Sequence, residues 1–561
     1  MADIGSRDHQ MFPVLTAHQM ETAKRFASTE RRHFTAGEIV YEIGDRTVPA
    51  WLVLEGSLEV FRHEGLSHEV YVTTHHPGQF SGEVNQLSGR PSLVRGRAGP
   101  GGCTAVSFDG AHIRALVIGS ADVGEIIMRA FILRRVSLIN AGGAGSVLVG
   151  VPGSSAVTRL QGFLTRSAYP HIILDASSDE EGLALIERLG VLPAELPLMV
   201  CPNGTVLKNP TDIEAALCLG MTPDLKSDVT YDVAIVGAGP AGLAAAVYAA
   251  SEGLSVIVLD ERSVGGQAGA SARIENYLGF PTGISGQALA GRAFNQALKF
   301  GAEIALPLEV LDLVPSPPDA KTHVLTLKLA RGGAVTARIV IVASGARYRR
   351  PEIAGIEAFE GAGVSYWASS IEAKLCEGEE IALIGGGNSA GQAVAFLAPQ
   401  VKRLRLVVRR PLEETMSRYL IERIAALPNV EIHTNCEVVS LEGDRLRGLS
   451  AAVLRDRTTG AEHRFPLRHM FLFIGADPNA AWIRKYAETD SNGFVLTGQP
   501  FRGEAAACTR PALPLETSVP NLFAIGDVRA ASTKRVAAAV GEGAAVVAQI
   551  HMALRFMAAQ H

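Results

Sequence analysis

Short apolar runs broken by glycine fill the first part of the chain and predict a β-rich domain over residues 1–140. Ala50–Leu54 and Leu58–Phe61 are two such runs, separated by Gly56. Apolar segments bounded by glycines are typical of strands joined by tight turns. The pattern then changes to helical spacing, with apolar side chains at Val123, Ile126, Ile127, Ala130, Phe131 and Leu133. This periodicity predicts an amphipathic helix that closes the domain.

Residues 145–221 alternate between strand-like and helix-like patterns and predict an α/β domain. The predicted strands are Ser146–Val149, His171–Leu174, Leu198–Cys201 and Thr205–Leu207. A polar hinge, residues 222–230, separates this domain from the rest of the chain.

One apolar stretch beyond the hinge resembles a membrane span by length alone. Val233–Ser251 carries no charge and is long enough to cross a bilayer. However, Gly237, Gly239 and Pro240 interrupt it directly after the strand-like run 231–236. A strand, a glycine turn and a helix explain the stretch better, so we expect no membrane association.

Composition and charge narrow the class without identifying the chemistry. The 561 residues are too many for one hydrophobic core, so several domains are expected. A net charge of −5 gives no electrostatic footprint for nucleic acid. The N-terminus lacks a secretory signal pattern, and we expect a cytoplasmic protein. The six cysteines (Cys103, Cys201, Cys218, Cys376, Cys436 and Cys508) show no metal-ligand spacing, which predicts free buried thiols and no metal site.

The glycines after residue 236 have the spacing of a dinucleotide-binding loop. Gly237 would make the tight turn, Gly239 would let the backbone approach a pyrophosphate, and Gly242 would let helix and strand pack closely. The next strand, 255–259, ends in Asp260, where a carboxylate is expected to hold ribose hydroxyls.

A second loop of this kind, Gly385-x-Gly387-x-x-Ala390, follows a strand that begins at Ile381. The strand after it, 404–408, ends in Arg409-Arg410 rather than in an acid. Arginines offer forked donors to a 2′-phosphate, which favours NADPH over NADH and leaves NADH open. The alternative is that both arginines are solvated surface charges.

Three ordered blocks make residues 231–561 resemble the low-molecular-weight thioredoxin reductases. They are the first glycine loop, Gly265–Gln267 with Ile274–Pro281, and Thr517–Val528 ending in a Gly-Asp pair. The resemblance implies an FAD-binding domain over 229–346 and 476–561, an inserted NAD(P)H-binding domain over 347–475, and a homodimer. It also implies that FAD is bound by Gly237, Gly239, Pro240, Ala241, Gly242, Asp260, Glu261, Gly266, Gln267, Asn276, Gly526, Asp527 and Val536. The nicotinamide nucleotide would be bound by Gly385, Gly387, Asn388, Ser389, Ala390, Arg409 and Arg410.

The redox-active cysteine pair of that family is missing. In the family a Cys-Ala-Thr-Cys tetrad follows Gly-Val-Ser-Tyr, whereas this chain has Trp367 and Ser370 at the two cysteine positions. An indole cannot relay electrons as a dithiol does. If the segment after Trp367 is helical, Cys376 lies about 13 Å further along the axis, which makes it a core thiol rather than a substitute.

The N-terminal domain resembles a cyclic-nucleotide-binding β-roll, notably in residues 51–60 and 78–90. The resemblance places Glu83, after Gly82, at the ribose-binding position and Leu93 where an arginine would pair with the cyclic phosphate. Arg95 and Arg97 lie beyond it. Without a guanidinium the phosphate loses a contact of about 1.5–3 kcal/mol, so we predict little or no cyclic nucleotide binding and a structural or docking role.

The second domain resembles the thioredoxin/glutaredoxin fold through the segment 196–204, in which Leu196–Pro197 would be a cis bond. Its dithiol position has Ser154 and Ser155, and serine is too weakly acidic to replace a thiolate. The predicted fold is therefore multidomain: a β-roll, a thioredoxin/glutaredoxin-like α/β domain, and two Rossmann-like α/β domains.

Two functions follow, and the sequence does not separate them. The first is an FAD-dependent oxidoreductase that passes a hydride from NADPH to FAD and then to oxygen, a quinone, a small disulfide or a separate protein partner. The second is a non-catalytic sensor whose flavin or nucleotide state is reported through the N-terminal domains. We favour the enzyme, because an intact nicotinamide site has little use without hydride transfer.

Overall fold

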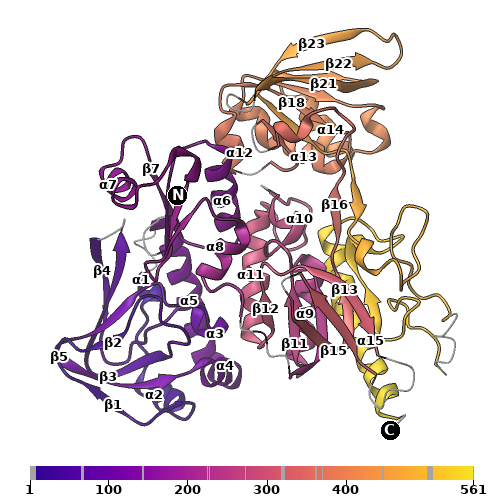
Figure 1. The fold of residues 1–561 in the computed structure, drawn as a ribbon. Helices are drawn as coiled ribbons and strands as arrows, with labels where there is room; N and C mark the ends of the chain where they lie inside the picture. Colours follow the sequence, from indigo (N-terminus) through magenta and orange to yellow (C-terminus); the bar gives the residue numbers. More distant parts are fainter. Residues whose placement is uncertain are drawn as a thin grey trace.

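The computed structural model describes residues 8–64, 68–141, 145–167, 169–223, 225, 228–271, 273–316, 323–330, 332–360, 363–368, 370–444, 448–501 and 510–559. Figure 1 shows the β-roll at one end, with α6 and α8 between it and α10 and α11. The sheet containing β18 and the β21–β23 sheet form the opposite end.

The N-terminal domain is a β-roll in which β1, β5, β3 and β4 pair in that order and β2 pairs with β5. The strands are β1 (Arg32–Phe34), β2 (Ile39–Tyr41), β3 (Ala50–Glu64), β4 (His68–His75) and β5 (Arg95–Phe108). The prediction of two short strands around Gly56 is wrong, because β3 runs through it as one bulged strand. Gly56 adopts φ +74° where β5 approaches so closely that a Cβ would lie 2.1 Å from the Gly102 carbonyl oxygen. The glycine therefore permits close strand contact rather than ending the strand.

Helices flank this sheet: α1 (Asp8–Met11), α2 (Ala17–Lys24), α3 (Asn85–Ser88), α4 (Gly110–Gly119) and α5 (Ala121–Ala141). The predicted amphipathic helix is confirmed in α5. Val123, Ala130 and Phe131 on its inner face are fully buried.

The second segment contains a sheet in the order β7, β6, β8, β9, in which β6 and β7 are parallel and β8 is antiparallel to both neighbours. Its elements are β6 (Ser146–Gly150), α6 (Ser155–Arg166), β7 (His171–Asp175), α7 (Glu180–Leu189), β8 (Leu198–Val200), β9 (Val206–Lys208) and α8 (Asp212–Cys218). All four predicted strands are confirmed within a residue or two. The Leu196–Pro197 bond is cis, as predicted.

A disulfide joins Cys201 to Cys218, so the expectation of free thiols is wrong for this pair. Helix α8 returns to the sheet and brings the two Cα atoms to 6.2 Å, within the usual range for a disulfide. The 17-residue separation contains a strand and a helix, which is why spacing gave no signal. Cys103 and Cys376 are free and buried, Cys436 is free and half-buried, and Cys508 lies outside the described residues.

The third sheet has the order β12, β11, β10, β15, β14, β13, with β26 pairing with β15. Its strands are β10 (Thr230–Val236), β11 (Val256–Leu259), β12 (Glu303–Ala305), β13 (Val310–Pro315), β14 (Leu325–Leu329), β15 (Ala334–Val342) and β26 (Leu522–Ala524). Helices α9 (Pro240–Ser251), α10 (Gly266–Gly269), α11 (Gly286–Lys299) and α15 (Val536–Ala558) accompany it. Strands β12, β11, β10, β15 and β26 are parallel, the arrangement expected of a Rossmann-like sheet.

A further parallel sheet, ordered β17, β24, β18, β19, β20, is inserted between β15 and β26. It is built from β17 (Val364–Ser365), α12 (Ser370–Leu375), β18 (Glu380–Ile384), α13 (Asn388–Leu397), β19 (Arg403–Val407), α14 (Arg418–Ala425), β20 (Val430–His433) and β24 (His469–Leu472). An antiparallel sheet of β21 (Cys436–Asp444), β22 (Gly448–Asp456) and β23 (Glu462–Pro466) adjoins it. Strands β16 (Ala346–Tyr348) and β25 (Ala476–Pro478) pair where the chain enters and leaves the insertion.

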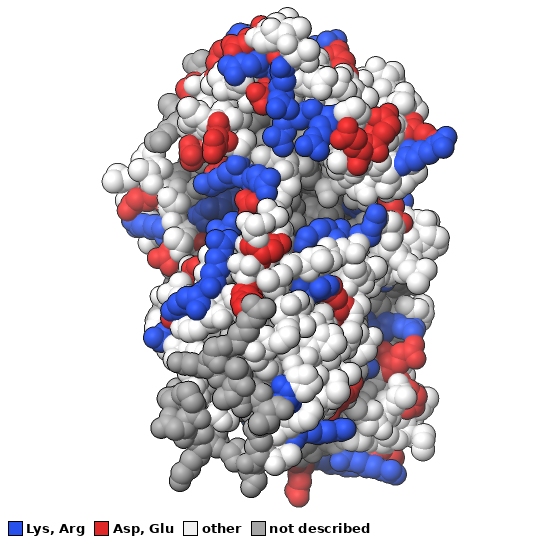
Figure 2. All heavy atoms as spheres, turned by 90° about the vertical axis from the view of Figure 1, so that its right-hand side faces the viewer, with Lys and Arg blue, Asp and Glu red and all other residues white. Residues whose placement is uncertain are grey.

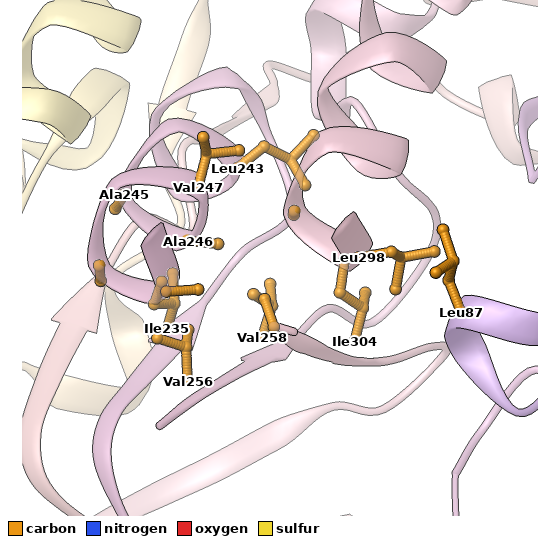
Figure 3. Close-up of a cluster of buried hydrophobic side chains, with 14 of the residues drawn as sticks. Leu87, Ile235, Leu243, Ala245, Ala246, Val247, Val256, Val258, Leu298 and Ile304 are labelled. Atoms are coloured by element: carbon orange, nitrogen blue, oxygen red, sulfur yellow. The ribbon is translucent and has the colours of Figure 1, made fainter. Parts of the chain in front are cut away.

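The β-roll and the third sheet share a continuous hydrophobic core. Leu87 of α3 belongs to the same buried cluster as Leu298 of α11 and Ile304 of β12, as Figure 3 shows. Leu93 of the β-roll is buried in a second cluster with Leu148 of the second segment. These contacts make the N-terminal domains integral to the molecule.

The interpretation of 233–251 as strand, turn and helix is confirmed by β10 and α9. Among the described residues one helix, α15, is long and apolar enough to cross a membrane by length and composition. Its Val546 and Ile550 side chains are fully buried in the core shared with α9. A core helix of a globular protein passes the same test.

Candidate functional site

The main cavity, of about 510 Å³, lies where the two Rossmann-like sheets meet. We call it the central cavity. Of the residues predicted for FAD, those that line it are Gly237, Gly239, Pro240, Ala241, Asp260, Glu261, Gly266, Gln267, Asn276, Gly526, Asp527 and Val536. Asn388, Ser389 and Trp367 line it as well. The structure therefore brings together segments that are far apart in the sequence.

The first glycine loop has the geometry its spacing predicted. Gly237 has φ +117°, and a Cβ there would lie 2.2 Å from the Ala343 carbonyl oxygen. A Cβ on Gly242 would lie 1.9 Å from the Gly237 carbonyl oxygen, so helix and strand touch. At Gly239 a Cβ would lie 4.0 Å from its nearest neighbour, the Cα of Gly266. Its surface therefore faces the cavity, where a pyrophosphate could approach the N-terminus of α9.

The acid after β11 is largely engaged with the backbone. The N–H groups of Ala238 and Arg262 donate to the Asp260 carboxylate at 2.7 and 2.8 Å, and Ser263 donates at 3.2 Å. Burial raises the pKa of Asp260 despite these donors. Asp260 thus holds the loop together, and Glu261 beside it is the carboxylate with more remaining capacity to accept from a sugar.

Further polar groups surround the part of the cavity between α10 and α15. The Gln267 side-chain amide donates to the Ala346 carbonyl oxygen, and Asn276 is exposed at the rim. Burial raises the pKa of the Asp527 carboxyl and, together with Asp527, raises that of Tyr348 to about 12. Val536 is the first residue of α15, as predicted, so its N–H is not used within the helix.

Basic side chains that the sequence analysis missed also line the cavity: Arg166, Arg262, Arg347, Lys534 and Arg535. In Figure 2 basic side chains border a hollow in the upper half of the face shown, while acidic and basic groups intersperse elsewhere. Cations at a helix N-terminus suit a dinucleotide pyrophosphate. Arg535 directly precedes Val536, which was a usable signal, whereas Arg166 comes from the second segment and no motif indicated it.

The second glycine loop repeats the geometry of the first. Gly385 has φ +138°, with a Cβ position 2.2 Å from the Phe473 carbonyl oxygen, and a Cβ on Gly387 would meet no described atom within 4 Å. Ala390 is fully buried under the loop. Because Asn388 and Ser389 begin α13 and line the central cavity, this helix N-terminus faces the first loop.

Arg409 and Arg410 lie outside the central cavity, just past the end of β19. Both are exposed, and Arg410 is 3.9 Å from Glu414. The carboxyl end of β19 adjoins the glycine loop after β18, because the two strands pair in parallel.

Trp367 occupies the wall of the central cavity. Its indole N–H donates to Glu372 at 2.8 Å, and the Arg166 guanidinium lies 5.5 Å from the ring centroid. Gln287 of α11 donates to the Thr165 carbonyl oxygen at 2.6 Å, which docks the end of α6 here. Ser370 begins α12, and its side chain lies outside the described part of the chain.

Cys376 is a core residue and does not line the cavity. It is fully buried among apolar side chains of the inserted sheet, and burial raises the pKa of its thiol to about 11. The prediction of a core thiol is confirmed.

The ribose-binding position of the β-roll is closed by its own neighbours. Glu83 is 5% exposed and faces Arg135 of α5 at 3.7 Å. Leu93 packs against the second segment. Arg95 pairs with Glu42 at 2.7 Å and Arg97 with Glu59 at 2.9 Å, so both guanidinium groups are engaged on the outer sheet.

Comparison with known proteins agrees with these two regions. Residues 231–543 match the family described as pyridine nucleotide-disulphide oxidoreductase, and residues 31–118 match the cyclic nucleotide-binding domain. Thioredoxin reductase of Treponema pallidum is 34% identical over 317 residues, which are 56% of this chain and 95% of that protein. An alkyl hydroperoxide reductase of Escherichia coli is 32% identical over 323 residues, 57% of this chain. The match spans 58% of that relative's own length.

Solved structures give the same result for the C-terminal part. Thioredoxin reductase of T. acidophilum superposes with a TM-score of 0.51 at 27% identity, covering 58% of this chain and 98% of that chain. Thioredoxin reductase of Lactococcus lactis in its FR conformation also gives 0.51, at 26% identity, over 58% of this chain and 99% of its own.

Proposed function

The chain belongs to the pyridine nucleotide-disulphide oxidoreductase family, and on that premise we propose that it transfers a hydride from NADPH to FAD and passes the electrons to an acceptor other than a dithiol beside the flavin. The family implies FAD and NAD(P)H. One observation carries the proposal: both glycine loops face the central cavity, and Trp367 lies in its wall.

The described residues fit FAD. The 4.0 Å clearance at Gly239 leaves room for a pyrophosphate against the backbone, and Arg535 lines the same space. Glu261 would accept from the adenosine ribose, Asp527 from the ribityl hydroxyls, and the Val536 N–H would donate to the flavin pyrimidine edge. When bound, FAD supplies the two-electron chemistry, and the protein supplies binding, orientation and exclusion of water.

The inserted domain would present NADPH to the same cavity. Gly387 and the N-terminus of α13 would hold its pyrophosphate, and Arg409 with Arg410 would pair with a 2′-phosphate at the end of β19. Arg423 of α14 pairs with Glu275 of the FAD half at 2.8 Å, which ties the two domains together in this orientation.

Trp367 determines what the enzyme does not do. Dithiol exchange needs an attacking thiolate and a resolving thiol close to the flavin, and the indole occupies the first of these positions. The Arg166 guanidinium covers the ring, and Cys376 is held in the core. We therefore propose no reduction of thioredoxin by the usual route. Oxygen, a quinone, a small disulfide or a separate redox protein remain the acceptor classes.

We also propose that the second segment has a thioredoxin/glutaredoxin-like fold, supported by its strand order and the cis Leu196–Pro197 bond. The β-roll would serve as a docking or structural domain with little cyclic nucleotide affinity. A cytoplasmic homodimer is the proposed state. A sensor function is the alternative, favoured by the core shared between the β-roll and the FAD half, through which a change at one site could reach the other.

Turnover with defined acceptors tests the proposal. The purified protein is expected to be yellow, to release FAD on denaturation and to lose its flavin absorbance when NADPH is added. Multiple turnover with oxygen or quinones separates the enzyme from the sensor. NADPH-dependent reduction of a disulfide dye through thioredoxin, at the rate of an ordinary thioredoxin reductase, would overturn the proposal.

A further inference from the structure

A second cavity, of about 440 Å³, lies between the β-roll and the second segment. We call it the N-terminal cleft. Its lining includes Gly44, Arg46 and Pro91 from the β-roll, and Asn203, Glu214 and Cys218 from the second segment. Within the described chain it shares no lining residue with the central cavity. Its volume suits a ligand of a few hundred daltons.

The Cys201–Cys218 disulfide forms part of this cleft in an asymmetric way. Cys218 is half-buried and lines the cleft, whereas Cys201 is 3% exposed and belongs to the core cluster of the segment. A nucleophile entering the cleft therefore reaches the Cys218 sulfur, and Cys201 becomes the leaving group.

The charges of the cleft favour one class of nucleophile. Arg46 brings a cation to the lining. The Glu214 carboxylate is engaged in capping α8, since it accepts from the Thr211 N–H at 2.8 Å and from the Thr211 hydroxyl at 2.9 Å. A thiol that carries its own carboxylate is thus attracted by Arg46 more than it is repelled by Glu214.

We propose that Cys218 is a thiol–disulfide exchange site for low-molecular-weight thiols bearing a carboxylate. The thiolate attacks the Cys218 sulfur, a new S–S bond forms, and the Cys201–Cys218 bond breaks with its electron pair on Cys201, which takes a proton from water. A second thiolate attacks the ligand sulfur of the mixed disulfide and releases Cys218 as a thiolate. Two external thiols are oxidised to one disulfide, and the protein disulfide is reduced by two electrons.

Exchange at this position would act on the contact between two domains. A Cβ on Gly44 would lie 3.2 Å from the Asn203 Cβ, and one on Gly220 would lie 2.6 Å from Pro91. The loop after Cys201 and the turn after Cys218 thus pack directly against the β-roll. A mixed disulfide on Cys218 would occupy this interface.

The test uses the full-length flavoprotein without NADPH, so that its outcome is independent of flavin turnover. The protein is incubated anaerobically with mercaptoacetate, mercaptoethanol or cysteamine, quenched in acid, alkylated with N-ethylmaleimide and mapped by peptide mass. Each rate is divided by the thiolate concentration, because the three thiols differ in pKa. We expect the first adduct on Cys218, formed about 3–10 times faster by mercaptoacetate than by cysteamine at low salt.

Arg46→Gln should abolish this order, and Lys208→Gln should preserve it. Lys208 is a matched control, since it lies on β9, pairs with Glu195 at 3.0 Å and does not line the cleft. A disulfide that resists all three thiols until the protein unfolds would overturn the exchange site, as would a first adduct on Cys201. Equal thiolate rates in the wild type, or an order unchanged in Arg46→Gln, would overturn the assignment of carboxylate-bearing thiols.

Discussion

Replacing the middle glycine of each loop by alanine should separate the two nucleotides. Gly239 has φ −75° and Gly387 has φ −89°, conformations that any residue adopts. A Cβ at Gly239 stays 4.0 Å from its neighbour, and one at Gly387 meets nothing within 4 Å. Neither change should therefore strain the apoprotein, and each should stabilise it by about 0.4–1 kcal/mol by restricting the unfolded chain.

The cost should appear in binding instead. Each new methyl group projects where a pyrophosphate would meet the backbone. Losing one charge-assisted hydrogen bond costs about 1.5–3 kcal/mol, which corresponds to a roughly 10–150-fold weaker Kd. Gly239→Ala should lose FAD, whereas Gly387→Ala should keep FAD and weaken NADPH.

The assays are denaturant unfolding of the apoproteins, FAD titration by fluorescence, and NADPH titration of the flavin spectrum. Gly237→Ala is the contrasting variant. Its Cβ would lie 2.2 Å from the Ala343 carbonyl oxygen at φ +117°, so it should destabilise the apoprotein by more than about 2 kcal/mol. Unchanged FAD affinity in Gly239→Ala, or equal loss of both nucleotides in both variants, would refute the reasoning.

Three further predictions concern separate parts of the chain. Arg409→Ala with Arg410→Ala should reduce the NADPH/NADH ratio of flavin reduction rates about tenfold or more, and an unchanged ratio, as expected for the exposed control Arg418→Ala, would make them surface charges. Calorimetry with cyclic AMP should show no micromolar binding, because Leu93 is packed in a core cluster; a micromolar Kd would contradict this. Alkylation of Cys376 should be slow near pH 8 and rise about tenfold per pH unit as the thiolate fraction increases, since the pKa of its thiol is raised to about 11; fast reaction at pH 7 would contradict burial.

Local patterns predicted the parts of the site that lie within one strand–turn–helix unit. The roles of Gly237 and Gly242 follow from chain stereochemistry, and the structure shows the close contacts that those roles require. Val536 was placed correctly because a helix start is also a local signal.

Contacts between distant segments were not predictable in this way. Arg166 reaches Trp367 only because α6 docks on α11, and Cys201 meets Cys218 only because α8 returns to its sheet. Asp260 was identified as a ribose ligand from its position, but its three backbone donors became visible only in the folded loop. Gly56 failed as a strand boundary because its role depends on β5, which lies about 40 residues later in the sequence.

Anaerobic titration with NADPH tests the central claim most directly, because it counts the electrons that the site can store. A dithiol enzyme of this family takes up two electrons on the flavin and two on the adjacent disulfide. With Trp367 at the first cysteine position, we predict that one equivalent of NADPH per FAD completes the reduction. Uptake of two equivalents per FAD, with the second lost in Cys376→Ser, would contradict the account and make Cys376 a working thiol.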